Sequence, residues 1–169
     1  PLSELEVNVT QKALVIGGGA AGMTAALELA DQGYPAVLIE KSGSLGGNAL
    51  HLGQTESGED VSAWVRSLVH KVENHQDIQV WTKASVQSTT GSVGSFQSRV
   101  DVAGESRTLD YGAAVVATGA REHKPESYLY GQDGRVMTHL EFDRQLAENP
   151  EQTAQSKGVA FIQCVGSRI

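Results

Sequence analysis

The chain has few cysteines and no long apolar segment. Its single cysteine, Cys164, excludes an internal disulfide, a Cys-x-x-Cys redox pair and a cysteine-ligated metal or iron–sulfur centre built from these 169 residues alone. Redox chemistry would therefore need a bound organic cofactor. No stretch of about 18 apolar residues is present, and the first ten residues lack the basic flank and apolar run of a signal peptide. We therefore expect a cytoplasmic protein that does not insert into a membrane.

Basic residues are also scarce. Thirteen Lys and Arg stand against twenty Asp and Glu, which gives a formal net charge of −7, and the basic residues form no run. Nucleic acids and anionic membrane surfaces need clustered basic residues, so neither is expected as the main partner.

Metal-ligating and nucleophilic patterns are missing as well. No two histidines have metal-ligand spacing together with a carboxylate partner, so we assign no metal to any of the five: His51, His70, His75, His123 and His139. No serine lies in a Gly-x-Ser-x-Gly turn, so a catalytic triad is unsupported. We expect no catalytic residue in this chain.

Glycine, by contrast, is abundant, with 19 residues against 4 prolines. The apolar run 13–16 leads directly into the glycine-rich turn 17–22, which is followed by an Ala- and Leu-rich helix that ends near Gly33. A second apolar run, 36–39, ends at Glu40. The pattern predicts a strand–helix–strand unit in a parallel sheet buried on both faces, and thus an α/β fold.

Later segments extend this pattern. We predict a covering helix over 59–75 with Trp64 packed on the sheet, and a strand over 78–81 that Trp81 closes. Three short β-rich runs between residues 84 and 110 favour an antiparallel meander, and 112–119 is predicted as another buried strand that ends at a glycine.

The C-terminal third carries further signals. Thr138 and Glu141 have the spacing of a capping box, which predicts a helix that Pro150 ends. A last strand is expected over 159–165, with Cys164 as a small buried residue in it.

The turn carries the spacing Gly-x-Gly-x-x-Gly at Gly17, Gly19 and Gly22. Gly17 allows the tight turn, Gly19 lets a pyrophosphate approach the backbone, and Gly22 allows the helix to pack closely on the sheet. Because the helix N-terminus offers unpaired N–H groups and a partial positive charge, binding needs no cationic side chain.

Glu40 strengthens the nucleotide interpretation. It lies 18 residues after Gly22, at the end of the second strand, where a carboxylate can accept hydrogen bonds from the diol of an adenosine ribose. A carboxylate also repels a 2′-phosphate, so FAD or NAD is favoured over NADP.

Several motifs together resemble a known family. Val-Ile-Gly-Gly-Gly-Ala-Ala-Gly at 15–22, Glu-Lys at 40–41, Leu-Gly-Gly at 45–47 and Ala-Thr-Gly at 117–119 are similar to flavoproteins with two dinucleotide-binding domains. Finer matches are Asp-Gln-Gly-Tyr at 31–34, Gly-Ser-Val-Gly-Ser-Phe at 91–96, Tyr-Leu-Tyr-Gly at 128–131 and Phe-Ile-Gln-Cys-Val-Gly-Ser-Arg at 161–168. These resemble the A-type subunit of heterodisulfide reductase and the flavin subunits of quinone-interacting oxidoreductases.

The resemblance implies a Rossmann-like FAD-binding fold with an inserted three-stranded meander, and a flavoprotein that relays electrons to or from iron–sulfur partner subunits. It implies pyrophosphate contacts from the turn and ribose contacts from Glu40, with Lys41 beside the adenosine. Diphosphate or ribityl contacts come from Gly47 and Asn48, and adenine contacts from the Val86 backbone. The complete implied set is Gly17, Gly19, Ala20, Ala21, Gly22, Glu40, Lys41, Gly47, Asn48, Val86, Ala117, Thr118 and Gly119.

Two departures accompany the resemblance. Many family members carry a cysteine-containing segment after the double glycine, whereas residues 49–60 contain none, so no cluster is expected there. Both ends of the chain look cut. We therefore expect a piece of a longer polypeptide: an FAD-binding domain over 1–157 without its completing strand, and the start of a second domain or of the return segment over 158–169. Such a piece is expected to be inactive alone and to hold FAD weakly or not at all.

Two alternatives stay open. The nucleotide could be NAD in a simple dehydrogenase domain, although such a domain would continue with strand–helix alternation where this chain has a meander. The chain could also be a non-catalytic docking module of a redox complex, with its nucleotide site unused.

Overall fold

A four-stranded parallel sheet forms the core of the larger part of the chain. The computed structural model describes residues 9–166. The sheet has the order β3-β2-β1-β7, formed by β1 (Ala13–Ile16), β2 (Ala36–Ile39), β3 (Ile78–Trp81) and β7 (Ala113–Val116). All three neighbouring pairs are parallel, with Ala13 opposite both Ala36 and Ala113. The predicted parallel sheet is confirmed.

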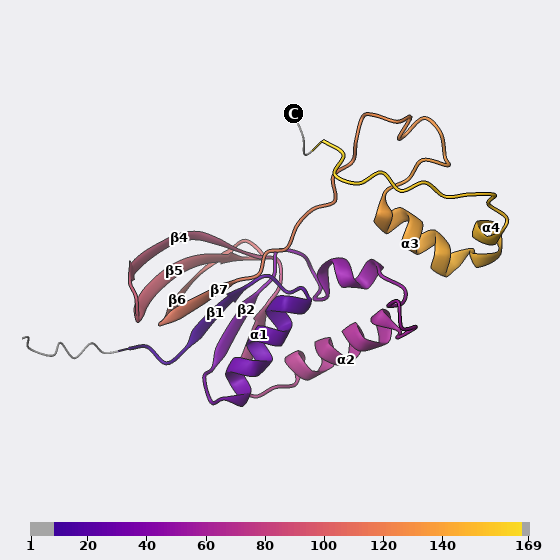
Figure 1. The fold of residues 1–169 in the computed structure, drawn as a ribbon. Helices are drawn as coiled ribbons and strands as arrows, with labels where there is room; N and C mark the ends of the chain where they lie inside the picture. The colour runs from indigo at the N-terminus through magenta and orange to yellow at the C-terminus, as the bar shows by residue number, and fades with distance from the viewer. Residues whose placement is uncertain (1–8, 167–169) are drawn as a thin grey trace, which may run out of the picture. The chain divides into compact units, whose positions relative to one another are not determined.

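Two layers cover this sheet on its opposite faces (Figure 1). Alternate residues of a strand point to opposite faces, so Leu14, Val37 and Ile39 share one face. They join a buried cluster with residues of the second sheet, such as Val100 and Leu109. Helices α1 and α2 lie on the other face (Figure 1). The apolar runs of β1 and β2 are therefore buried from both sides.

Helix α1 (Ala20–Asp31) follows β1 directly and ends at a glycine, as predicted. Gly33 has a φ of +85°, and its N–H donates to the carbonyl of Ala30, while the Tyr34 N–H donates to that of Leu29. This pattern satisfies the last carbonyls of a helix and needs a left-handed residue. Met23, Ala26 and Ala30 form the buried face of α1.

Helix α2 (Val61–Glu73) lies within the predicted range, but the prediction for Trp64 is wrong. Val65, Leu68 and Val72 are buried at helical spacing, whereas the Trp64 side chain is 50% exposed. Trp64 lies four positions before Leu68 and so flanks the buried stripe, where half of its large side chain stays exposed. Trp81 ends β3 as predicted and is buried.

The predicted meander is confirmed as a separate antiparallel sheet. It has the order β4-β5-β6 and is formed by β4 (Ala84–Ser92), β5 (Ser95–Val102) and β6 (Glu105–Tyr111). The buried Ser98 hydroxyl lies 2.8 Å from the Tyr111 hydroxyl, which satisfies both polar groups inside the sheet.

Strand β7 forms where predicted, but it is not a buried strand. Ala113, Ala114 and Val116 are exposed, and β7 is an edge of its sheet. Within residues 9–166 no further strand pairs with β7, which explains why its apolar side chains remain accessible.

The chain divides into two compact units. The first comprises residues up to 49 and Ala63–Gly119, and the second comprises Leu50–Ser62 and the residues from 120 onward. The short 3-10 helix η1 (Gly47–His51) leads from the first to the second. In the second unit the Gly53 N–H donates to Asp143 Oδ2 at 2.7 Å. The predicted boundary between residues 157 and 158 remains a prediction.

Helix α3 (His139–Glu148) begins with the predicted capping box. The Glu141 N–H donates to the Thr138 hydroxyl at 3.3 Å, and the Thr138 N–H donates to Glu141 Oε2 at 2.9 Å. The helix ends before Pro150 as expected, but Pro150 itself begins a further short helix, α4 (Pro150–Ala154). Proline is suited to this first position because its missing N–H would have no helical partner.

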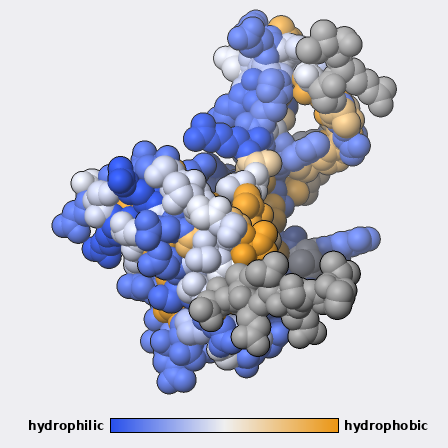
Figure 2. Space-filling model, turned by 90° about the vertical axis from the view of Figure 1, so that its left-hand side faces the viewer, coloured by the Kyte–Doolittle hydropathy of each residue, from blue (hydrophilic) through white to orange (hydrophobic). Residues whose placement is uncertain are grey.

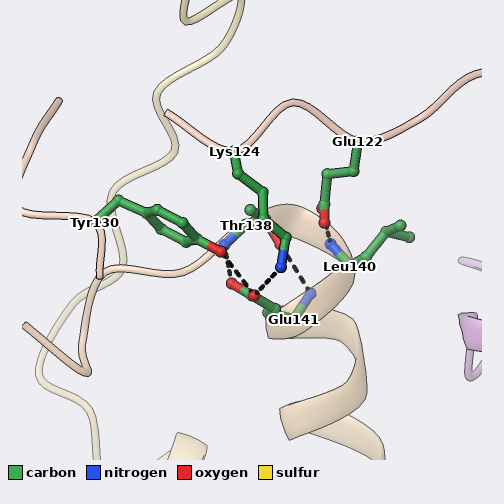
Figure 3. A network of polar contacts seen from close by, with 6 residues as sticks. All are labelled: Glu122, Lys124, Tyr130, Thr138, Leu140 and Glu141. Atoms are coloured by element: carbon green, nitrogen blue, oxygen red, sulfur yellow. Dashed lines mark hydrogen bonds and ion pairs between the residues drawn. The ribbon is translucent and has the colours of Figure 1, made fainter. Parts of the chain in front are cut away.

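Residues 122–130 of the preceding loop bond to the start of α3 at the capping box (Figure 3). The Tyr130 hydroxyl donates to Glu141 Oε1 at 2.8 Å, and the Lys124 ammonium lies 3.5 Å from the same oxygen. Glu122 accepts a hydrogen bond from the Leu140 N–H. The bond from the Thr138 amide, helped by the Tyr130 hydroxyl and opposed by partial burial, holds the pKa of Glu141 below its ordinary value.

The predicted last strand is wrong. Residues 159–165 form no strand, and Val159, Phe161 and Ile162 are more than half exposed. A strand needs a partner, and this segment has none within the described part of the chain. Cys164 is exposed rather than buried. The end of the second predicted domain, 167–169, lies outside the described residues, as do residues 1–8 of the first.

On the face shown in Figure 2, hydrophilic residues predominate and hydrophobic residues form small areas. Between residues 9 and 166, no helix combines the length and the apolar character needed to cross a membrane.

Replacing Thr138 by alanine tests the capping box. The change removes the hydroxyl that accepts from the Glu141 amide, so α3 should lose about 1 kcal/mol of stability. Hydrogen exchange measured by mass spectrometry should then be faster over residues 139–148. Thr138→Ser keeps the oxygen and should exchange like the original chain. Equal protection in both variants would show that the cap contributes nothing.

Replacing Gly22 by alanine tests the packing of α1. A Cβ at this position would overlap the carbonyl oxygen of Gly17, and backbone cannot move aside as a flexible side chain can. The free energy of unfolding in urea should fall by about 3 kcal/mol or more. Thr24→Ala, on the exposed side of α1, should change it by less than about 0.5 kcal/mol. Similar values for the two variants would contradict the expectation.

Candidate functional site

The candidate site begins where β1 turns into α1. Gly17 has a φ of +111°, and a side chain there would overlap the carbonyl of Ala117. The same turn brings the Cβ of Ala117 to 3.4 Å from the Cβ position of Gly22. Residues about a hundred positions apart thus meet without intervening side chains. The structure brings together Gly17, Gly22, Ala117 and Thr118 as the sequence predicted.

Gly19 differs from its two partners in the motif. Its φ is −77°, which any residue can adopt, and no atom lies within 4 Å of the position that its Cβ would occupy. Gly19 is the N-cap of α1, so this open space adjoins the first N–H groups of the helix, which have no partner inside it. Fold packing alone does not require glycine here, but a ligand close to the backbone would.

Glu40 follows β2 and reaches back to the turn. Its Oε2 accepts the Gly18 N–H at 2.7 Å, and its Oε1 accepts the Ser42 N–H at 2.7 Å. Partial burial alone would raise the pKa of Glu40, but the hydrogen bonds from Ser42 and Gly18 and the charge of Lys41 outweigh it, so the pKa lies below its ordinary value. The carboxylate is therefore ionised at neutral pH and fixed in place.

A second backbone segment closes the other side of the turn. The Gly46 N–H donates to the Gly18 carbonyl at 2.8 Å, and Gly19 and Gly46 form an isolated parallel bridge. Gly47 follows with a φ of +55°, and its Cβ position lies 3.1 Å from the Cα of Gly19. This approach explains the glycine at position 47 and places the first residue of η1 against the N-cap residue of α1.

Sequence reasoning missed three participants: Gly18, Ser42 and Gly46. A Cβ on Gly18 would collide with Leu45 and would lie 3.0 Å from Cβ of Glu40. The signal that could have found Gly18 and Gly46 is the surplus of glycine, since Gly-Gly-Gly and Gly-Gly contain more glycines than the binding motif needs. Nothing in the sequence singles out the Ser42 amide.

For the other predicted residues the structure gives a position near the turn or in a nearby element but no contact that points to a ligand. Ala20 and Ala21 open α1, Asn48 lies in η1, and Lys41 is exposed beside Glu40. Gly119 ends the turn 117–119 that follows β7, and it has a φ of +64°. Their contacts to a ligand stay predictions.

Val86 lies on β4, an edge strand of the meander, next to an irregularity in the pairing between Val86 and Ser88. Such irregularities free backbone groups and occur next to binding sites. An adenine contact from the Val86 backbone also stays a prediction.

The arrangement supplies binding groups rather than reacting ones. It offers backbone N–H groups suited to a diphosphate and an ionised carboxylate suited to a diol. Among residues 9–166 no group of three or more His, Cys, Asp or Glu side chains could hold a metal ion.

Sequence comparison shows the family of the chain. The profile of the pyridine nucleotide-disulphide oxidoreductases matches residues 11–162. A protein of Archaeoglobus profundus, named for its likeness to the A-type subunit of heterodisulfide reductase, is 34% identical over 149 residues, which cover 84% of this chain and 21% of that protein. The A-type subunit of ferredoxin:CoB-CoM heterodisulfide reductase from Methanosarcina acetivorans is 40% identical over 105 residues, covering 59% of this chain and 13% of the relative. The chain thus spans about a fifth or less of these relatives.

Solved structures agree on the fold. L-proline dehydrogenase from P. horikoshii has a TM-score of 0.57 at 30% identity, over 70% of this chain and 25% of that one. Thioredoxin reductase from T. acidophilum has a TM-score of 0.56 at 20% identity, over 72% of this chain and 41% of that one, and supports the fold alone. The family profile and the match to L-proline dehydrogenase together indicate a flavin or nucleotide cofactor. The chain belongs to the pyridine nucleotide-disulphide oxidoreductase family, in which its relatives include the A-type subunit of heterodisulfide reductase.

Proposed function

We propose that this chain binds FAD through its adenosine diphosphate half. The observation that carries the proposal is the open space at Gly19, which lies at the N-terminus of α1 and within one residue of the Glu40–Gly18 bond. A diphosphate fits that space because the helix amides and the partial charge of the helix end favour an anion. Glu40 fits the ribose, since each carboxylate oxygen has a further lone pair for a hydroxyl.

FAD is favoured over the other dinucleotides. The ionised Glu40 would repel the 2′-phosphate of NADP. The meander between β3 and β7 replaces the helix that a plain nicotinamide-binding domain would carry at this place, which favours FAD over NAD. The edge of β4 at Val86 would meet the adenine.

The proposed role in the larger protein is electron relay in the cytoplasm. A flavin exchanges either one or two electrons, so it can connect hydride donors with the iron–sulfur centres of partner subunits. The residues of this chain position and bind the flavin without reacting with it. Dithiol chemistry would need cysteines from elsewhere, since Cys164 is the only cysteine of the sequence.

Replacing Gly19 by valine tests the diphosphate site directly. The side chain enters open space at an ordinary φ, so the fold should keep its unfolding midpoint while FAD binding falls below detection. The purified chain is titrated with FAD, and flavin fluorescence and absorbance are followed, with NADH titrated in parallel. Gly134→Val is the control, because its Cβ also meets nothing within 4 Å. Unchanged FAD affinity in the Gly19 variant would place the phosphate elsewhere.

Glu40 is tested by replacement with glutamine and alanine. Losing a charge-assisted hydrogen bond to the ribose should raise the dissociation constant for FAD by about 10- to 100-fold. Because the pKa of Glu40 is lowered, the carboxylate stays ionised and binding by the original chain should be flat between about pH 8 and 5, then weaken as the pH falls through the lowered pKa. The glutamine variant should lack this acid limb. Equal affinity and an identical pH profile for chain and variant would contradict the ribose role.

A further inference from the structure

Lys83 is held in an unfavourable backbone conformation beside the candidate site. It lies between β3 and β4 with a φ of +50°, in the left-handed region. Glycine and asparagine adopt this region readily, whereas a lysine does so at a cost. Strained residues of this kind persist where surrounding structure fixes them, and they gather at functional sites.

Three backbone hydrogen bonds fix Lys83 next to the ribose carboxylate. Its N–H donates to the Ser42 carbonyl at 2.8 Å, and its carbonyl accepts the Ala103 N–H at 2.9 Å. The following amide, that of Ala84, donates to the Glu40 carbonyl at 2.9 Å. The turn is therefore attached to the segment that carries Glu40, and a substitution of the Lys83 side chain leaves these bonds intact.

The side chain extends along that same segment. Its Cε lies 3.5 Å from the Cβ position of Gly43, so the aliphatic stem passes over the loop that follows Glu40. No carboxylate between residues 9 and 166 forms an ion pair with the Lys83 ammonium. Val86, whose backbone is the candidate adenine contact, lies three residues further along.

We propose that Lys83 is a specificity-determining residue that contacts the adenosine of the bound dinucleotide. The inference rests on the proposed function, because Glu40 is the proposed ribose contact and Val86 the proposed adenine contact, and Lys83 lies near both: the amide after it bonds to the Glu40 carbonyl, and Val86 is three residues further along. Adenine has an apolar face and acceptor nitrogens, and lysine matches both with an apolar stem and a donor at its end.

The test compares Lys83→Asn with Lys83→Met. Asparagine relieves the strain and removes the contact, so it should raise the thermal unfolding midpoint while raising the dissociation constants for FAD and ADP by the same factor, about three- to tenfold. Methionine keeps a stem of similar length without the ammonium and should lose less affinity than asparagine. FMN, which lacks adenosine, should bind both variants as it binds the original chain.

Ala103→Asn is the matched control. Ala103 is exposed and also left-handed, with a φ of +54°, so asparagine should raise the unfolding midpoint there with no change in FAD affinity. Unchanged FAD and ADP affinity in both Lys83 variants, while the original chain binds both ligands, would overturn the role of Lys83 alone. Failure of the original chain to bind FAD or ADP would overturn the proposed function and this inference together.

Discussion

The site depends on one close approach of backbone to backbone. Gly17, Gly22 and the carbonyl of Ala117 lie so near one another that no side chain fits on either glycine. This contact fixes the start of α1 against the ends of β1 and β7, and so directs the helix N-terminus outward from the sheet. Gly19 then faces open space, and Glu40 reaches the turn from the neighbouring strand. The direction of the helix end and the place of the carboxylate both follow from that packing.

The turn and the sheet around it could be predicted because their signals are local. Gly22 is required by packing against Gly17 five residues earlier, the glycine spacing of the motif is itself a local pattern, and the apolar runs of β1 and β2 reflect burial on both faces. The carboxylate could be predicted because it follows the second strand at a regular distance. The start of α3 at Thr138 and the end of α1 near Gly33 could likewise be predicted, because each depends on residues only a few positions apart.

Features set by distant partners could not be predicted in the same way. The pairing of Gly18 with Gly46 joins two loops, and neither loop alone shows it. Trp64 has the helical spacing of a buried residue, but it flanks the buried stripe of α2, and half of its side chain stays exposed. The apolar residues of β7 and of 159–165 predict burial, yet most of them stay exposed; even Phe161, whose ring contacts those of His139 and Phe142, is 59% exposed. Periodicity reports what a segment could bury, whereas the neighbours decide what it does bury.

Glu40 is already bound by two amides before any ligand arrives, and the groups around Gly19 belong to the main chain. A ligand that docks here finds few rotatable bonds to immobilise on the protein side. Folding has already ordered these protein groups, so little further conformational entropy of the protein is lost when a ligand binds. Binding of the proposed diphosphate would therefore need little rearrangement of the protein, and it would depend mainly on backbone groups and Glu40 rather than on other side chains.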